Sequence, residues 1–154
     1  MNSEVNGTFL SKFDDVQRIH LDSNVLIYFI EKNPKYHALI LPIFRWIDEG
    51  RLKAVSSTLS ILEVLVHPLR QNRADLAADY RKILLGNPHL TIFPVDTAVA
   101  EEGATIRANS SCKTPDAIQL ATALKYGAEI FLTNDRQFRS VTGLEVILLD
   151  DFVA

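Results

Sequence analysis

Two aspartates follow short apolar runs that are typical of β-strands. Asp22 comes directly after RIHL, and Asp135 lies within the turn TNDRQF that follows IFLT. In parallel sheets, binding crevices lie beyond the carboxyl ends of the strands. Each aspartate alone could simply cap a helix or close a turn. Two such acids after two strands favour a shared site more strongly than either does alone.

Two further acids fall in predicted helices. Glu63 stands inside the apolar run ILEVLV, where a carboxylate is expected to lose hydration. It should therefore be paired, with His67 as the nearest candidate one turn later, or be protonated or bound to a cation. Asp116 falls in the first turn of its helix, where the helix dipole favours negative charge. Because Asp116 shares a helix face with Leu120, we expect it to point inward.

The chemistry depends on whether the four carboxylates meet. Like charges about 5 Å apart repel by roughly 3 kcal/mol per pair at an effective dielectric of 20. A cluster of ionised acids would therefore take up protons or a divalent cation. Hard oxygen ligands without a cysteine or histidine set favour Mg²⁺ or Mn²⁺ over zinc. The proposed metal ligands are Asp22, Glu63, Asp116 and Asp135.

The elements that must position these acids alternate along the chain. Strands are expected at 16–22, 53–57, 90–93, 129–133 and 145–149. Helices are expected at 23–32, 36–49, 58–70, 76–84, 97–109 and 114–126. Such alternation predicts an α/β fold of three layers, with a short, mainly parallel sheet of about five strands between helices.

Several helix ends have recognisable signals. Ser23 is placed to cap the first helix, and Thr114 followed by Pro115 is a strong helix start with a hydroxyl cap. Pro68 should bend its helix or end it early. Residues 1–15 are polar and mixed, and we expect a short tail or edge extension.

Composition excludes several classes of protein. With 154 residues, 47% of them hydrophobic, the chain is the size of one globular domain. No apolar run is long enough to span a membrane, no secretory signal is visible, and the single cysteine, Cys112, permits no internal disulfide. A cytoplasmic protein is expected. The net charge of −3 argues against binding nucleic acid through bulk positive charge, so contacts with phosphate would have to be local.

Three segments resemble the PIN-domain nucleases, in particular the VapC-like toxins of toxin–antitoxin pairs. LDSNVLIYFIE resembles the family's opening strand, aspartate and helix, and SSTLSILEVL its glutamate helix. PDAIQLATALKYGAEIFLTNDRQF resembles its third acid, alanine-rich helix, strand and Thr-x-Asp turn. The order and spacing of these segments carry the resemblance, which divides the chain into an N-terminal extension, 1–15, and a PIN-like nuclease domain, 16–154.

The resemblance assigns roles to individual residues. It places the catalytic acids on Asp22, Glu63, Asp116 and Asp135. It places supporting hydroxyls on Ser23 and Thr133, which can fix a carboxylate rotamer or a metal-bound water. Asn24 and Asn134 are weaker candidates for the same support.

The resemblance also implies an activity and partners. It implies Mg²⁺- or Mn²⁺-dependent hydrolysis of single-stranded RNA, a homodimer and a small inhibitory antitoxin. Lys113, Arg136 and Arg139 lie near the presumed mouth and are candidates for holding RNA, although ordinary surface charge also explains them. An apolar groove for the antitoxin is expected beside helices 24–32 and 36–49.

Three other functions are alternatives to this one, and the sequence argues against two of them. A phosphatase of the haloacid-dehalogenase type would carry an aspartate two positions after Asp22, where this chain has Asn24. A response-regulator receiver would need a lysine near the end, which the stretch EVILLDDFVA lacks. The remaining alternative is a PIN-like RNA-binding or scaffold module that no longer catalyses.

Overall fold

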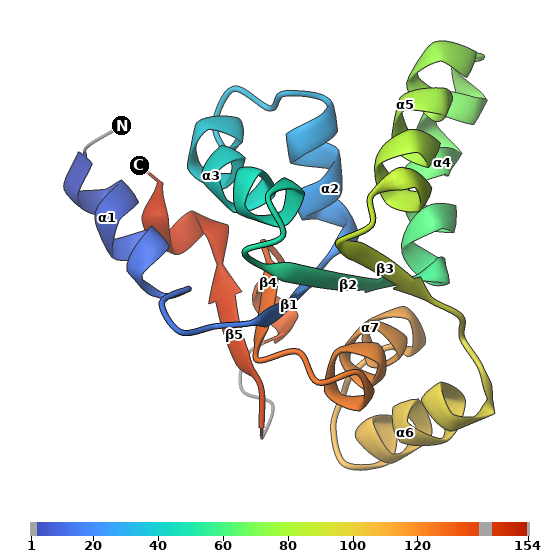
Figure 1. The fold of residues 1–154 in the computed structure, drawn as a ribbon. Helices are drawn as coiled ribbons and strands as arrows, with labels where there is room; N and C mark the ends of the chain where they lie inside the picture. Colours follow the sequence, from blue (N-terminus) through green and yellow to red (C-terminus); the bar gives the residue numbers. More distant parts are fainter. Residues whose placement is uncertain (1–2, 139–142, 154) are drawn as a thin grey trace.

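A parallel five-stranded sheet forms the centre of the protein (Figure 1). The computed structural model describes residues 3–138 and 143–153, with side chains from residue 6 onward. The strand order is β3-β2-β1-β4-β5, and all four neighbouring pairs are parallel. The strands are β1 (Arg18–Leu21), β2 (Lys53–Ser57), β3 (Leu90–Phe93), β4 (Ile130–Thr133) and β5 (Glu145–Leu148).

Helices cover both faces of this sheet, which confirms the predicted three-layer α/β/α architecture (Figure 1). One layer holds α1 (Ser3–Ser11), α2 (Ser23–Ile30), α3 (His37–Asp48), α4 (Thr58–Arg70) and α5 (Ala74–Gly86). The other holds α6 (Thr97–Ala108) and α7 (Thr114–Lys125). None of the helices in the described ranges is long and apolar enough to cross a membrane.

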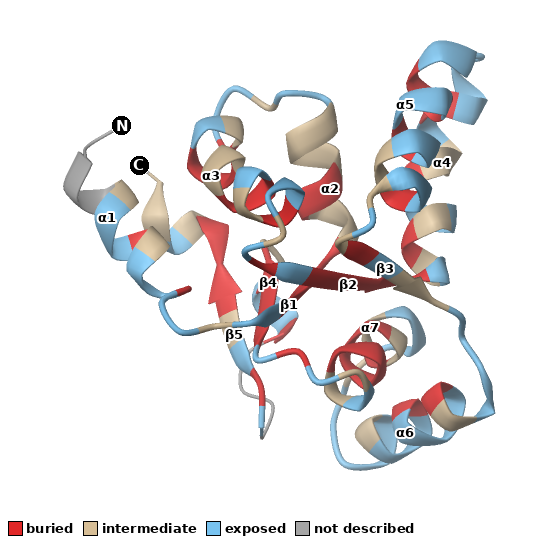
Figure 2. Ribbon diagram, in the orientation of Figure 1, coloured by how far each residue is buried: buried red, intermediate tan, exposed pale blue. Residues whose placement is uncertain are grey.

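Side-chain alternation along β1 divides the core in two. Ile19 and Leu21 are fully buried in the larger cluster, beneath α2 and α3. His20 points to the opposite face and stacks on Phe131 of the smaller cluster, with ring centroids 4.6 Å apart. Figure 2 shows the buried strands between the two helical layers. The central strand therefore contributes to both halves of the core, as a two-sided sheet requires.

The expectation of a polar N-terminal tail is wrong. Residues 3–11 form α1, and Phe9 is fully buried against the rings of Phe13 and Phe152, the latter with its centroid 5.2 Å away. Phe9 and Phe13 are four residues apart, so they share one side of the helix and its following turn. The N-terminal segment is therefore part of the larger core.

Three predicted helix ends differ from the structure. Asp22, not Ser23, caps α2, because its carboxylate accepts a hydrogen bond from the backbone N–H of Ser23. Pro68 lies inside α4, which continues to Arg70. The cap position of α7 is Lys113, without a side-chain hydrogen bond, and Thr114 is already helical.

Candidate functional site

Asp22 is a nearly buried carboxylate at the carboxyl end of the central strand. Its backbone N–H donates to Leu132 O across the sheet at 3.0 Å. One carboxylate oxygen accepts from the backbone N–H of Ser23 at 2.8 Å, and the other accepts from the hydroxyl of Thr133 at 2.6 Å. Asn24 donates more weakly to that second oxygen, at 3.4 Å. With 5% of the residue exposed, the carboxylate is fixed by its neighbours rather than by water.

Burial raises the pKa of Asp22 to about 6. The hydrogen bonds from Thr133 and Ser23 act in the opposite direction, and the negative charges of Glu63 and Asp116 raise the pKa further. Desolvation penalises the charged form, and like charges nearby add to that penalty. A cation placed beside Asp22 would therefore stabilise its ionised carboxylate.

Thr133 links the first acid to the last. Its hydroxyl is fully buried at the end of β4, donates to Asp22 and accepts from the backbone N–H of Asp135 at 3.0 Å. The carboxylate of Asp135 in turn accepts from the backbone N–H of Gln137 at 2.9 Å. One hydroxyl thus links the end of β1 to the turn after β4.

Glu63 is exposed, so the expectation that it loses its hydration within an apolar helix face is wrong. The run ILEVLV contains only one buried residue, Val64, and Leu62 beside it is 61% exposed. An ion pair with His67 is not present among the described residues. Instead, Glu63 Oε1 accepts a hydrogen bond from Gln119 Nε2 of α7, at 3.1 Å.

That glutamine belongs to a buried chain of hydrogen bonds. Gln119 is 2% exposed, and the same Nε2 donates to the hydroxyl of Ser60 at 2.9 Å. Ser60 and Ser56 are 2.8 Å apart, and Ser56 donates to Leu21 O at 2.9 Å. Since Ser56 uses its proton on that carbonyl, Ser60 must be the donor between the two serines. The chain connects Glu63 to the strand that carries Asp22.

His20 lies beside this chain with no exposed surface. Within the described residues, neither ring nitrogen of His20 has a hydrogen-bond partner, and Gln119 Oε1 has none either. Burial lowers the pKa of His20 to about 3, and its interaction with Gln119 acts in the opposite direction. A neutral imidazole N–H is a donor and the free amide oxygen an acceptor, so each is the other's natural partner.

Asp116 lies at the start of α7 and is half-buried. Burial raises its pKa, the charge of Asp135 raises it further, and Lys113 opposes the rise. Both aspartates also raise the pKa of the Cys112 thiol, after the larger effect of burial. These effects favour the protonated thiol over the reactive thiolate.

Pairwise electrostatic interactions connect all four acids. Asp22 experiences the charges of Glu63 and Asp116, and Asp116 that of Asp135. In the described part of the chain, no three acid, histidine or cysteine side chains are spaced to hold a metal ion as they stand. The donor set nevertheless fits a hard divalent cation by its chemistry: oxygen ligands only, one of them a desolvated carboxylate. A bound cation would require side-chain rotations, which the exposed Glu63 is free to make.

The predicted RNA contacts divide into two groups. Lys113 and Arg136 are exposed, and Lys113 is close enough to Asp116 to affect its titration. Arg139 lies outside the described residues.

Arg107 holds the loop before α7 in place by donating to Cys112 O at 3.0 Å and to the Thr114 hydroxyl at 2.8 Å.

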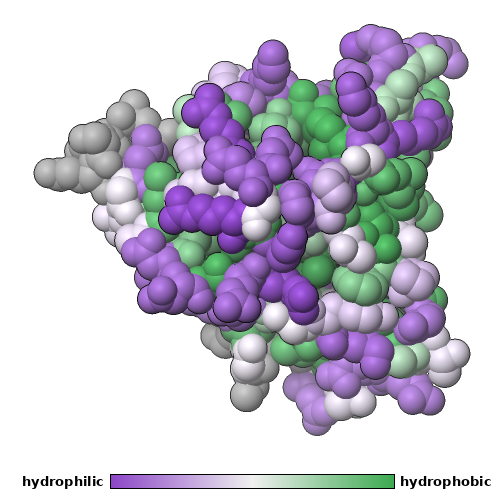
Figure 3. Space-filling model, viewed as in Figure 1, coloured by the Kyte–Doolittle hydropathy of each residue, from purple (hydrophilic) through white to green (hydrophobic). Residues whose placement is uncertain are grey.

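The aromatic side chains of α2 and α3, where an antitoxin groove was expected, pack against the larger core. Tyr28 stacks on Tyr36, and Phe29 stacks on Phe44 with ring centroids 3.8 Å apart. Trp46 lies beneath the guanidinium of Arg51. The large exposed apolar side chains of the described residues are Leu62, Leu69, Leu85 and Val95. Figure 3 shows a hydrophobic area on the right of the view, over α4 and β3.

Sequence reasoning missed the residues that orient Glu63. Gln119 follows Asp116 by three positions, and Ser60 precedes Glu63 by three. Residues three apart lie on the same side of a helix. The signal available in the sequence was a polar residue three positions from Asp116 and another three positions from Glu63.

Known proteins share the fold of this chain. The model of the PIN domain family matches residues 19–144. Among solved structures, a toxin–antitoxin complex from Klebsiella pneumoniae has a chain 20% identical, with a TM-score of 0.63, covering 85% of this chain and 97% of that one. VapBC2 from Rickettsia felis, bound to a DNA fragment from its promoter, is 14% identical, with a TM-score of 0.68 and coverages of 86% and 98%. No curated protein sequence matches.

Proposed function

The chain belongs to the PIN-domain family, and from that membership and its four acids we propose a metal-dependent endoribonuclease that cuts single-stranded RNA. PIN domains are generally nucleases. The observation that carries the proposal is Asp22, a buried carboxylate whose pKa rises to about 6 and which experiences the charges of two other acids. A polyanionic substrate cannot approach such a group unless the negative charge is balanced.

Divalent metal is the proposed cofactor, as Mg²⁺ or Mn²⁺. When bound, it would supply an activated water and stabilise the leaving oxygen of an in-line displacement. The ligands would be Asp22, Asp116 and Asp135, with Glu63 completing the set. Thr133 and the Ser23 backbone N–H hold the Asp22 carboxylate in one orientation.

Glu63 is held differently from the three aspartates. Its one described hydrogen bond comes from Gln119, so the glutamine decides where that carboxylate points. Because the rest of Glu63 is exposed to water, it is suited to contact substrate or a metal-bound water. Lys113 and Arg136 are the exposed cations that we assign to the RNA backbone, together with Arg139.

The biological setting is proposed from the structural neighbours. They are described as toxin–antitoxin and VapBC complexes, which supports the toxin of a VapBC-type pair, with a small antitoxin as partner. We further propose a cytoplasmic homodimer. The exposed leucines of α4 and α5 are better placed for apolar contacts with a partner than the packed rings of α2 and α3.

Cleavage of single-stranded RNA by the purified protein tests the proposal. Activity should require added Mg²⁺ or Mn²⁺, disappear in chelator, and be lost in Asp116→Asn. Asp79→Asn, an exposed acid on α5, is the matched control and should retain activity. Products should carry 5′-phosphates and 3′-hydroxyls, because water rather than the 2′-hydroxyl attacks. A 2′,3′-cyclic phosphate, or equal cleavage by Asp116→Asn, would contradict the mechanism.

Two further readouts separate this function from the alternatives. Mn²⁺ should raise the melting temperature of the wild type but not of Asp116→Asn, because only a folded site binds the ion. RNA binding and a Mn²⁺ shift without cleavage would identify a non-catalytic module. Hydrolysis of a simple phosphomonoester with no action on RNA would identify a phosphatase.

A further inference from the structure

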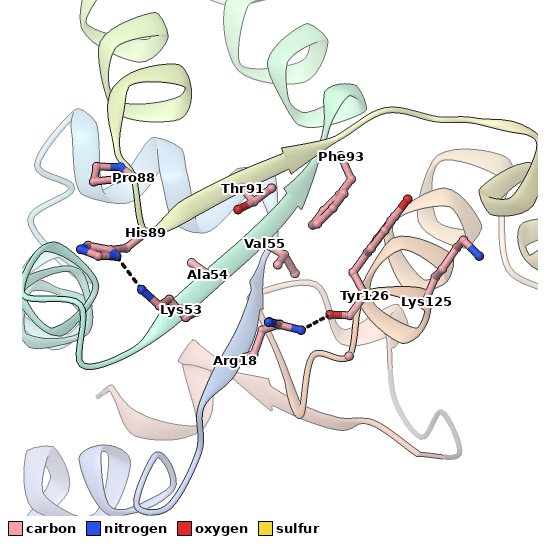
Figure 4. Close-up of a pocket in the computed structure, with 11 residues that line it drawn as sticks. Arg18, Lys53, Ala54, Val55, Pro88, His89, Thr91, Phe93, Lys125 and Tyr126 are labelled. Carbon is pink, nitrogen blue, oxygen red and sulfur yellow. Dashed lines mark hydrogen bonds between the residues drawn. The ribbon is translucent and has the colours of Figure 1, made fainter.

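A cavity of about 540 Å³ opens on the α7 side of the sheet, where β1 and β2 begin (Figure 4). It exists because α7 packs on β2 but ends at Lys125, so the outer part of this face is left uncovered. Asp22 and Arg18 stand at opposite ends of β1, about 13 Å apart at the usual rise of a strand. The cavity is therefore separate from the acid site.

The lining of the cavity is cationic. Arg18, Lys53 and Lys125 contribute positive charge to it, His89 lines it as well, and no aspartate or glutamate does. None of these cations forms an ion pair with an acidic side chain of the described residues. Most surface lysines and arginines are simply solvated, but three around one cavity in a protein of net charge −3 form a local positive site.

Two of the cations are held in place by neutral partners. Lys53 Nζ lies 2.7 Å from His89 Nδ1, so that ring nitrogen accepts and the ammonium keeps its other protons for a ligand. Arg18 Nη1 donates to Tyr126 O at 2.9 Å, which leaves its remaining N–H groups unused by that contact. Figure 4 shows both dashed interactions, with Lys53 on the left, Arg18 below, and Lys125 on the right beyond Tyr126.

An aromatic wall completes the cavity. The rings of Phe93 and Tyr126 stack with centroids 3.5 Å apart and planes 8° from parallel, joining the end of β3 to the end of α7. Both residues are partly exposed and line the cavity. Cations that hold a phosphate beside an aromatic surface that accepts a base are the combination used for unpaired nucleotides.

We propose that this cavity binds one nucleotide unit, its phosphate at Lys53 and Arg18 and its base against the aromatic wall of Phe93 and Tyr126. The volume lies within the usual 300–1,000 Å³ range of small-molecule sites. The nucleotide is either free or part of an RNA strand, since both present the same phosphate and base. Binding requires no metal and does not depend on the proposed nuclease activity.

Binding in excess chelator, with Asp116→Asn as host, tests the site without help from the acids. The probes are 5′-AMP, adenosine, inorganic phosphate and a short single-stranded oligonucleotide, measured by calorimetry. AMP should bind more tightly than either adenosine or phosphate. Lys53→Gln and Arg18→Gln should each weaken AMP binding about tenfold, the usual loss for one charge-assisted hydrogen bond. Lys12→Gln, an exposed lysine on the far side of the fold, should leave it unchanged.

The oligonucleotide distinguishes the two sources of the ligand. Tighter binding of the oligonucleotide than of AMP, weakened by Lys53→Gln, identifies an RNA strand; equal or weaker binding identifies a free nucleotide. Phosphate binding as tightly as AMP would overturn the nucleotide assignment. Absence of binding by every phosphate-bearing probe, or binding unaffected by both Lys53→Gln and Arg18→Gln, would overturn the site itself, whatever the nuclease assay gives.

Discussion

Asp22 illustrates how one residue carries both structure and chemistry. It caps α2, joins β1 to β4 through Thr133, and keeps a carboxylate in a place where ionisation is unfavourable. A cap alone would function equally well with a solvated aspartate. The burial is therefore better explained by a task that needs a poorly hydrated carboxylate, such as holding a cation.

Gln119 is the residue whose removal should isolate positioning from catalysis. Gln119→Leu removes the donor to Glu63 and leaves the four acids intact. Supporting groups of this kind typically contribute about 10- to 100-fold to activity or metal affinity, and we expect a loss in that range. RNA cleavage and Mn²⁺ titration measure it.

A double-mutant cycle shows whether the effect passes through Glu63. In a Glu63→Ala background, Gln119→Leu should cause little further loss, because the carboxylate it orients is gone. Gln71→Leu, an exposed glutamine after α4, is the control and should be neutral. Additive losses would mean that Gln119 acts by some other route.

His20 should make the protein sensitive to acid. Its pKa is lowered to about 3 in the folded state, against 6.5 when unfolded, so below pH 6.5 the unfolded chain binds a proton that the folded one does not. Stability from this group is therefore lost as pH falls, by about 1.4 kcal/mol per unit. Between pH 6 and pH 4, the free energy of unfolding of His20→Phe should rise relative to that of wild type by this amount for each unit that the pH falls.

Urea unfolding of both proteins in chelator measures the difference, and the titration of Asp22 cancels because both contain it. Phenylalanine keeps the stacking on Phe131. His67→Phe, at an exposed position, should show no such trend. A pH-independent difference between wild type and His20→Phe would refute a neutral buried imidazole.

Among the helices, α1 contradicts the sequence-based expectation most clearly. Its sequence offers few apolar residues and no periodic face, and only the spacing of Phe9 and Phe13 pointed to burial. Phe152, which lies 143 positions after Phe9 in the chain, is a partner that local patterning cannot reveal. The helix is therefore specified by tertiary contacts more than by its own residues.

Phe9→Ala should accordingly destabilise the whole protein. The ring is fully buried, and deletion of such a side chain usually costs about 3–5 kcal/mol. Urea unfolding at constant pH measures the change in the free energy of unfolding. Leu62→Ala, 61% exposed on α4, is the matched control and should shift it by less than about 0.5 kcal/mol. A similar small shift for Phe9→Ala would mean that α1 is an appendage.

The other elements were predictable because their patterns are local. Alternating apolar runs and amphipathic repeats located all five strands and the helices α2 to α7 to within a few residues. Helix ends were less certain: Asp22 and Ser23 both suit a cap, and backbone geometry chose the first. The exposure of Glu63 could not be predicted, because it depends on which side of α4 faces α7 and which faces solvent.

At the scale of the whole molecule, the sheet keeps two chemistries apart. Acids gather beyond the carboxyl ends of the strands, and unpaired cations lie around the cavity where β1 and β2 begin. The net charge of −3 conceals this division. Any polyanion would meet attractive and repulsive surfaces on the same small protein, so its orientation is restricted before contact.

Cooperative folding of the protein should require the complete sheet. A chain ending at Lys125 retains α1 to α7 but lacks β4, which pairs with β1 and carries Thr133. Loss of the central pairing and of Phe131 should abolish cooperative unfolding, as followed by circular dichroism in urea beside the full chain. A sharp transition in the shortened chain would show that β1, β2 and β3 form a stable unit without the rest.

The hydrogen bond between Thr133 and Asp22 spans 111 positions of the chain. During translation the first acid leaves the ribosome long before the residue that fixes it has been polymerised. The proposed site therefore cannot be assembled on a nascent polypeptide before Thr133 and Asp135 have been added to it. For an enzyme proposed to destroy RNA, this delay shields the message that encodes it from the growing chain.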